Sequence, residues 1–257
     1  EDVAAARGEF FVYDDGFRAR SYTYAEVGRA ARGFAARLQG AGLGKGDKVV
    51  LWSENRPEWI MALWGCLLTG SIAVPIDYRA SRDFLTRVGR IVNAKLLLLG
   101  DDVEDPRQGN GQRAEGGEPE VWKLSEIDWR ALDSSALKPV DVTRDDTVEI
   151  IFTSGATAEP KGVVLTHKNV LANIVPVERE VLKYRKYGKP FFPIRFLNLL
   201  PLSHMFGQSM ATFIPPMLGG TTVFIHSFNP NDIVRQIRER RISVLVSVPK
   251  ILDVLRE

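Results

Sequence analysis

The sequence predicts an α/β fold in which βαβ units form mostly parallel sheets flanked by helices. Strand-like and helix-like segments alternate along the chain, which is typical of parallel strands joined by crossover helices. Several strand-like segments are apolar at every position, as expected of strands covered on both faces. With 257 residues, of which 45% are hydrophobic, the chain can form two such units, which we place at residues 1–140 and 141–257.

The helices of the first unit have recognisable starts. Thr23 and Glu26 form a capping box, and apolar residues follow them at helical spacing. Asn55 and Pro57 begin the next helix, and Ser81 caps a third. Three apolar strands are predicted beside these helices, at residues 48–52, 72–76 and 95–99.

Residues 101–120 differ from the rest of the first unit. This stretch has no apolar periodicity and is rich in glycine, proline and charged residues, so we expect a mobile insertion. An edge strand at 121–127 and a helical turn at 129–132 follow it.

The second unit continues the alternation of strands and helices. Its predicted strands are residues 148–152, 196–200, 222–226 and 243–248. Its predicted helices are one from Lys168 with a break near Pro176, one at 205–218, one from Asn229 and Pro230 to Arg240, and one begun by Pro249.

The loop after strand 148–152 carries the pattern of a phosphate-binding site. It lies at the carboxyl end of a buried strand, where α/β proteins bind their ligands. Gly155 and Gly162 let backbone N–H groups turn toward an anion, and Lys161 adds a positive charge. Further hydroxyl donors are Thr153, Ser154 and Thr157.

The residue sequence of this loop distinguishes between two known phosphate-binding patterns. A Walker A loop needs Gly-Lys followed by Ser or Thr, whereas Lys161 stands between Pro160 and Gly162. The stretch TSGATAEPKG instead resembles the signature of the adenylate-forming superfamily, which includes acyl-CoA synthetases, luciferases and peptide-synthetase adenylation domains. Ala156 and Ala158 stand where a hydroxyl residue and a glycine are usual. The matching positions are Thr153, Ser154, Gly155, Thr157, Pro160, Lys161, Gly162, Thr166 and His167.

This resemblance implies the incomplete N-terminal domain of an acyl-adenylating enzyme that uses ATP, magnesium and CoA. Lys161 is then a catalytic residue as well as a phosphate ligand. The family's magnesium ligand, ribose-binding Asp and C-terminal Lys lie outside this sequence, so we expect no metal ligand here. We also expect a C-terminal remainder of the same enzyme as a partner. The implied nucleotide-binding positions are Thr153, Ser154, Gly155, Ala156, Thr157, Lys161 and Gly162.

Two further segments resemble the family's acyl-binding motifs. In PLSHMFGQ, the resemblance places His204 beside the reacting carboxylate as a catalytic residue and Phe206 against the acyl group. Because a carboxylate is already ionised at neutral pH, we expect His204 to orient it and not to transfer a proton. In VSVPKIL, the resemblance assigns Val248 and Pro249 to the acyl pocket, and a plain buried strand entering a helix explains these two equally well.

Composition excludes several classes of protein. The 34 basic and 32 acidic residues give a net charge of +2, which is too small to predict nucleic acid as a partner. Cys66 is the only cysteine and lies in an apolar helical run, so we expect an inert core thiol. The first residues lack the apolar core of a signal peptide, and we expect a cytoplasmic location.

Basic and aromatic residues alternate between Lys183 and Arg195. This pattern suits peripheral contact with the inner face of an anionic membrane, and it also suits a solvated loop, which we favour.

Taken with the resemblance, these observations predict the N-terminal part of an acyl-CoA synthetase that activates a medium- or long-chain fatty acid with ATP and transfers it to CoA. We expect this part alone to be inactive. The alternatives are an acyl-AMP ligase that loads a carrier protein and a noncatalytic module that binds a lipid surface, which the loop's Ala156 and Ala158 favour.

Overall fold

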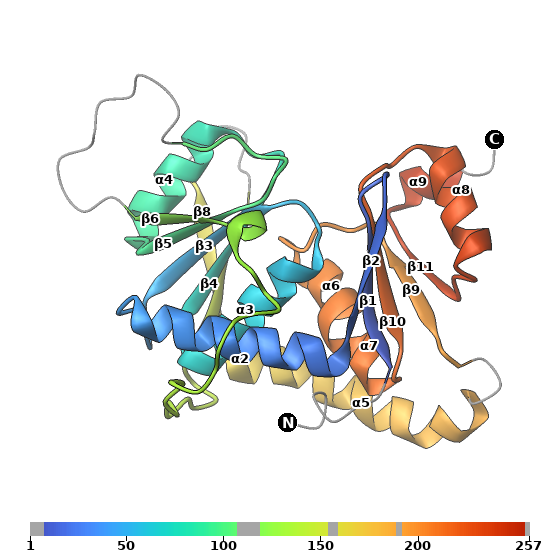
Figure 1. Cartoon of the computed structure of the whole chain (residues 1–257), viewed down its shortest axis with the longest axis horizontal. Helices are drawn as coiled ribbons and strands as arrows, with labels where there is room; N and C mark the ends of the chain where they lie inside the picture. The colour runs from blue at the N-terminus through green and yellow to red at the C-terminus, as the bar shows by residue number, and fades with distance from the viewer. Residues whose placement is uncertain (1–7, 107–118, 154–158, 189–191, 255–257) are drawn as a thin grey trace. The chain divides into compact units, whose positions relative to one another are not determined.

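A computed structural model of the chain describes residues 8–106, 119–153, 159–188 and 192–254 (Figure 1). The chain divides into two compact units. Unit 1 comprises Glu1–Gly28, Asn55–Pro57 and Leu171–Glu257, and unit 2 comprises Arg29–Glu54 and Glu58–Val170. The boundary expected at residue 140 falls inside unit 2, because the strands on both sides of it belong to one sheet.

The sheet of unit 2 has six strands in the order β6-β5-β3-β4-β7-β8. All neighbours in it are parallel except the last two strands, which form an antiparallel hairpin. This arrangement confirms the predicted α/β class. Its strands are β3 (Lys48–Ser53), β4 (Ile72–Asp77), β5 (Leu96–Leu99), β6 (Glu120–Lys123), β7 (Thr147–Thr153) and β8 (Lys161–Thr166).

Helices cover both faces of this sheet, with α4 (Arg82–Val92) on one side and α3 (Pro57–Thr69) on the other (Figure 1). The Ser81 hydroxyl accepts the N–H of Phe84, as the predicted cap requires. One side of α4 is apolar, and Leu85 and Val88 pack with strand residues such as Val74. This burial on both faces explains why the strands are apolar throughout.

The sheet of unit 1 has five strands in the order β11-β9-β10-β1-β2, and only β1 and β2 are antiparallel. The β1–β2 hairpin was not predicted, although an apolar run ending at Asp15-Gly16 is a recognisable turn signal. The strands are β1 (Glu9–Asp14), β2 (Ala19–Thr23), β9 (Arg195–Asn198), β10 (Thr221–Ile225) and β11 (Val244–Val246).

The remaining helices begin near the predicted residues. Thr23 and Glu26 form the expected capping box, in which Thr23 N–H donates to the Glu26 carboxylate at 2.7 Å. The helical run after His204 contains a π-helical turn at Ser209–Phe213. These helices are α2 (Tyr24–Gly40), α5 (His167–Gly188), α6 (Met205–Gln208), α7 (Ile214–Met217), α8 (Pro230–Glu239) and α9 (Pro249–Val254).

The break predicted at Pro176 is wrong, because α5 continues through this residue. Proline removes one helical hydrogen bond and leaves the carbonyl of Ala172 without its usual donor. Both residues are exposed, so water can bind that carbonyl and the helix can continue.

The segment after β5 also differs from its prediction. The expected edge strand exists as β6, but it ends at Lys123 and a 3-10 turn (Leu124–Glu126) replaces its second half. Residues 101–106 are held within unit 2, where the Glu54 carboxylate accepts the N–H groups of Asp101 and Asp102, each at 3.3 Å. Residues 107–118 lie outside the described residues, so mobility of the insertion stays a prediction.

Candidate active site

The predicted phosphate loop joins the two strands of the β7–β8 hairpin. Phe152 pairs with Gly162 and Thr153 pairs with Lys161, so both strands continue to the two ends of the loop. Since β7 lies parallel to β4, the loop leaves the sheet at its carboxyl edge, as expected. The Thr153 side chain and residues Ser154, Gly155, Ala156 and Thr157 lie outside the described part, and their phosphate contacts stay predictions.

Lys161 is exposed at the first position of β8. Its ammonium group has no hydrogen bond or ion pair with any other described residue. An ammonium that no carboxylate neutralises is available to an anionic ligand.

Gly162 has a steric role that the sequence analysis missed. A Cβ at this position would lie 2.7 Å from Ile150 Cγ2 and 2.9 Å from Phe152 Cζ. Both distances are too short for a carbon contact, so glycine allows β8 to pair closely with β7 beside the Phe152 ring.

The two acyl-motif segments leave one edge of the unit 1 sheet. Strands β9 and β11 are parallel neighbours, with Asn198 opposite Val246, and they lie side by side in Figure 1. The ladder extends by one bond, in which Leu199 N–H donates to the Val246 carbonyl at 2.9 Å. The four predicted acyl-site residues therefore all follow the carboxyl ends of these two strands: His204, Phe206, Val248 and Pro249.

Three apolar side chains remain exposed at this edge. Phe206 is 62% exposed, Val248 is 43% exposed and Leu252 is 46% exposed. Phe206 and Val248 follow the ends of adjacent strands, and exposed apolar side chains at strand ends are typical of surfaces that bind an apolar group.

His204 immediately precedes α6 in an extended conformation. Its backbone N–H donates to the Pro201 carbonyl at 3.2 Å, and its carbonyl accepts the N–H of Gln208 at 3.0 Å. The imidazole itself is exposed and does not cap the helix, and it bonds to no other described side chain. The backbone of His204 is therefore fixed, while both ring nitrogens are available to a ligand.

Two asparagines hold the backbone that leads to His204. The Asn55 side chain donates to the Leu200 carbonyl at 2.7 Å and accepts the N–H of Leu202 at 2.9 Å. Asn198 donates to the same Leu200 carbonyl at 3.3 Å and accepts the Leu200 N–H at 3.3 Å. Asn55 was predicted to start a helix, but α3 begins at Pro57 and the Asn55 amide bonds to this distant segment instead.

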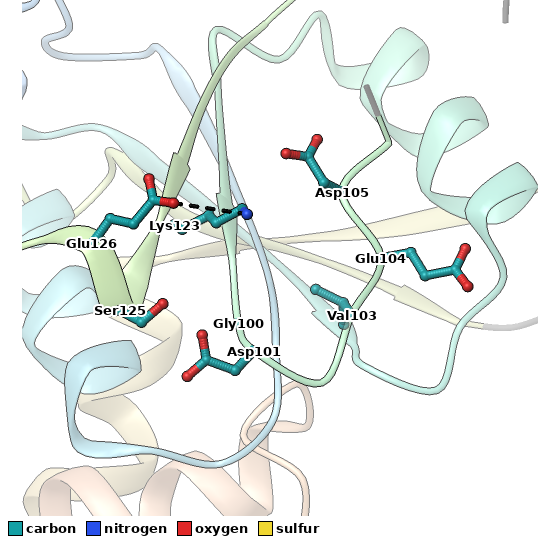
Figure 2. Close-up of a pocket in the computed structure, with 8 residues that line it drawn as sticks. All are labelled: Gly100, Asp101, Val103, Glu104, Asp105, Lys123, Ser125 and Glu126. Carbon is teal, nitrogen blue, oxygen red and sulfur yellow. Dashed lines mark ion pairs between the residues drawn. The ribbon is translucent and has the colours of Figure 1, made fainter. Parts of the chain in front are cut away.

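A hollow of about 520 Å³ in unit 2 shares no residue with the predicted site (Figure 2). Four of its lining residues are acidic, and Glu126 forms an ion pair with Lys123 at 3.7 Å. Glu104 points away from this pair in Figure 2. The lining residues are Gly100, Asp101, Val103, Glu104, Asp105, Lys123, Ser125 and Glu126.

The basic segment between Lys183 and Arg195 is not one loop. Helix α5 extends to Gly188, and Lys183 forms an ion pair with Glu180 at 2.6 Å. The Arg195 guanidinium donates to the Arg240 carbonyl at 3.1 Å. Both basic residues thus have partners within the protein, and membrane contact stays a prediction. No helix among the described residues is long and apolar enough to cross a bilayer.

The sequence matches the family of AMP-binding enzymes over residues 1–257. The chain belongs to the AMP-binding enzyme family. This membership confirms the resemblance found in the signature loop, and it assigns the described fold to the N-terminal domain of that family.

Individual relatives within the AMP-binding enzyme family act on different acids. Feruloyl-CoA synthase from Amycolatopsis sp is 28% identical over 88% of this chain and 43% of that protein. The fatty acid–[acyl-carrier-protein] ligase ScoC from Streptomyces coeruleorubidus is 29% identical over 92% of this chain and 45% of that protein. The chain therefore spans a little under half the length of these relatives.

A solved member of the family has the same fold. The N-terminal domain of FACL13 from Mycobacterium tuberculosis, crystallised with an inhibitor, is 25% identical and superposes with a TM-score of 0.80. This match covers 98% of the present chain and 61% of that chain.

Proposed function

We propose that this chain is the N-terminal part of an acid–thiol ligase that activates a carboxylic acid with ATP and transfers the acyl group to CoA. The observation that carries the proposal is the position of the signature segment at the carboxyl end of β7, with Lys161 at its end, which no carboxylate of the described residues neutralises. Membership in the AMP-binding enzyme family supports it.

In the first step, a carboxylate oxygen attacks the α-phosphorus of ATP. The bond from that phosphorus to the oxygen bridging to the β-phosphorus breaks, and pyrophosphate leaves with the electron pair. Lys161 and the hydroxyl and backbone N–H groups of residues 153–162 would hold the β- and γ-phosphates and stabilise the leaving charge. His204 would orient the carboxylate through one ring nitrogen, since no proton has to be removed.

In the second step, the CoA sulfur attacks the acyl carbonyl carbon and loses its proton. The bond between that carbon and the AMP oxygen breaks, giving the thioester and AMP. Magnesium would neutralise phosphate charge when bound. The described residues contain no group of three or more His, Cys, Asp or Glu side chains that could hold a metal ion.

The acid is proposed to be a medium- or long-chain fatty acid. The exposed apolar side chains of Phe206 and Val248, in the segments that resemble acyl-binding motifs, support this choice. Transfer to a carrier protein instead of CoA is a second candidate, favoured by the similarity to ScoC.

Exchange of labelled pyrophosphate into ATP by the full-length protein tests the first step. We expect exchange that requires both magnesium and a carboxylic acid, with fatty acids better than cinnamic acids. If only aromatic acids support pyrophosphate exchange, the proposed substrate class changes from fatty acids to aromatic acids. No exchange with any acid of a broad panel would overturn the enzymatic proposal in favour of a noncatalytic lipid-binding module.

The acceptor and the location need separate measurements. Incubating the preformed acyl-AMP with CoA or with a phosphopantetheinylated carrier protein, and analysing the thioester by mass spectrometry, distinguishes the two acceptors. A cytoplasmic protein with peripheral membrane contact should bind anionic liposomes less after Lys183, Arg185 and Lys186 are changed to Glu. Unchanged liposome binding would remove the membrane proposal.

A further inference from the structure

The backbone before His204 depends on one side chain from a distant part of the sequence. Asn55 lies in the connection between β3 and α3, and its amide group spans Leu200 to Leu202 with one donated and one accepted hydrogen bond of 2.7 and 2.9 Å. A carboxamide presents a donor and an acceptor in one plane, so it can bond to two backbone groups as a neighbouring strand would.

Asn55 itself is firmly held. It is partly buried, its neighbour Arg56 is only 2% exposed, and Pro57 is buried at the start of α3. The Asn55 side chain has two rotatable bonds, and on a backbone held in this way it has few alternative positions. Its hydrogen bonds therefore fix the Leu200–Leu202 backbone, and that backbone does not fix Asn55.

No second side chain of the described residues bonds to the Leu202 backbone. Asn198 bonds to both backbone groups of Leu200 and donates to the Gly207 carbonyl at 3.4 Å, whereas the Leu202 N–H donates to Asn55. Leu202 lies two residues before His204, whose imidazole has no described partner of its own to keep it in place.

We propose that Asn55 is a positioning residue of the acyl site, which sets the location of the His204 imidazole by holding the Leu200–Leu202 backbone. This inference rests on the proposed function. It predicts that removing the carboxamide lowers the rate of acid activation through His204, without a direct effect on ATP binding.

The test measures pyrophosphate exchange by the full-length protein in a double-mutant cycle. Asn55→Ala should lower kcat at least about tenfold and leave the KM for ATP within about twofold. In a protein that already carries His204→Ala, the same change should cost less than about twofold, because there is no imidazole left to position. Equal losses in both backgrounds would overturn the inference and leave a purely structural role.

A second variant separates positioning from loss of folding. Asn55→Asp keeps the acceptor for Leu202 N–H but places a carboxylate oxygen against the Leu200 carbonyl. At neutral pH this Asp is ionised and cannot donate, so Asn55→Asp should lower kcat in the unmodified background and cost less than about twofold in the His204→Ala background. Equal losses for Asn55→Asp in the two backgrounds would contradict the proposal even if Asn55→Ala fails to fold.

Asn229→Ala is the matched control, because Asn229 also lies in unit 1 and its side chain accepts the N–H of Asn231 at 2.9 Å at the start of α8. It should lower the thermal midpoint and leave kcat unchanged. Hydrogen exchange of a peptide covering residues 199–206 supplies a readout that needs no catalysis. Faster hydrogen exchange in Asn55→Ala with an unchanged kcat would contradict the positioning role alone. If the unmodified protein catalyses no pyrophosphate exchange, the proposed function itself is wrong.

Discussion

Gly207 lies so close to Pro201 that an added Cβ would be 2.2 Å from the Pro201 carbonyl oxygen and 3.0 Å from its carbonyl carbon. The first turn of α6 therefore packs directly on the backbone of the loop that precedes it. The same Pro201 carbonyl accepts the N–H of His204. The glycine of PLSHMFGQ is thus explained by packing, and any side chain there must displace the loop that carries His204.

Gly207→Ala should destabilise the protein by about 1 to 3 kcal/mol, as overpacking typically does, and should slow adenylation as well. Gly89→Ala is its control, since a Cβ at Gly89 in α4 meets no atom within 4 Å. That change should stabilise the protein by about 0.5 to 1 kcal/mol. Thermal unfolding and pyrophosphate exchange measure both effects, and equal behaviour of the two variants would contradict the packing argument.

Lys161→Ala should lower kcat/KM for ATP at least about tenfold. A charge-assisted contact contributes about 1.5 to 3 kcal/mol, and about 1.4 kcal/mol corresponds to a factor of ten. The fold should survive, because the side chain is exposed and has no partner among the described residues. Lys168→Ala, which removes another exposed lysine, should leave kcat/KM for ATP unchanged. An unaltered rate in well-folded Lys161→Ala protein would end the phosphate-binding assignment.

His204→Ala and Phe206→Ala should have different kinetic signatures. Loss of the imidazole should slow adenylation of every acid by a similar factor, whereas loss of the exposed aromatic ring should change the order of preference among chain lengths. The measurement is kcat/KM for a series of fatty acids of increasing length. If His204→Ala shifts the preference and preserves the rate, the two roles are reversed.

Cys66 should be unreactive in the folded protein. The thiol is fully buried, and burial raises its pKa to about 12, with the charge of Glu149 adding to the shift. Below that pH the group stays protonated, so at pH 8 the reactive thiolate should be roughly a thousandfold scarcer than for a thiol at the ordinary value. Iodoacetamide labelling followed by peptide mass spectrometry checks this. Modification at pH 8 before unfolding would show that the site opens.

Local sequence signals predicted most of the regular structure. The Thr23–Glu26 capping box, the Ser81 cap and the apolar strands beside them depend on residues close in sequence, and each is present. The β1–β2 hairpin was missed although its turn signal is local. The prediction of a break at Pro176 was wrong because this part of α5 is exposed to solvent, which cannot be read from the sequence. Water can replace the backbone hydrogen bond that the proline removes, so the helix continues.

The candidate site was only partly predictable for a different reason. The signature segments predict roles for Lys161 and His204, because their residue types are tied to chemistry, and these roles stay predictions. The residues that support them act through contacts of the folded backbone: Asn55 bonds to Leu200, which lies far away in the sequence, and Gly207 packs on the backbone of Pro201. Neither a propensity nor a periodicity encodes such a contact, so only the folded structure reveals it.

The parallel pairing of β1 with β10 also affects how the protein can be made. Phe11 is opposite Thr222, so its neighbouring strand emerges from the ribosome roughly 200 residues later. At typical rates of about 5 to 20 residues per second, the nascent β1–β2 hairpin waits on the order of 10 to 40 s for this partner. Throughout that interval Phe11 and Val12 lack the β10 residues that bury them in the finished sheet. Translation speed between the two strands thus sets how long the apolar side chains of β1 stay uncovered by β10.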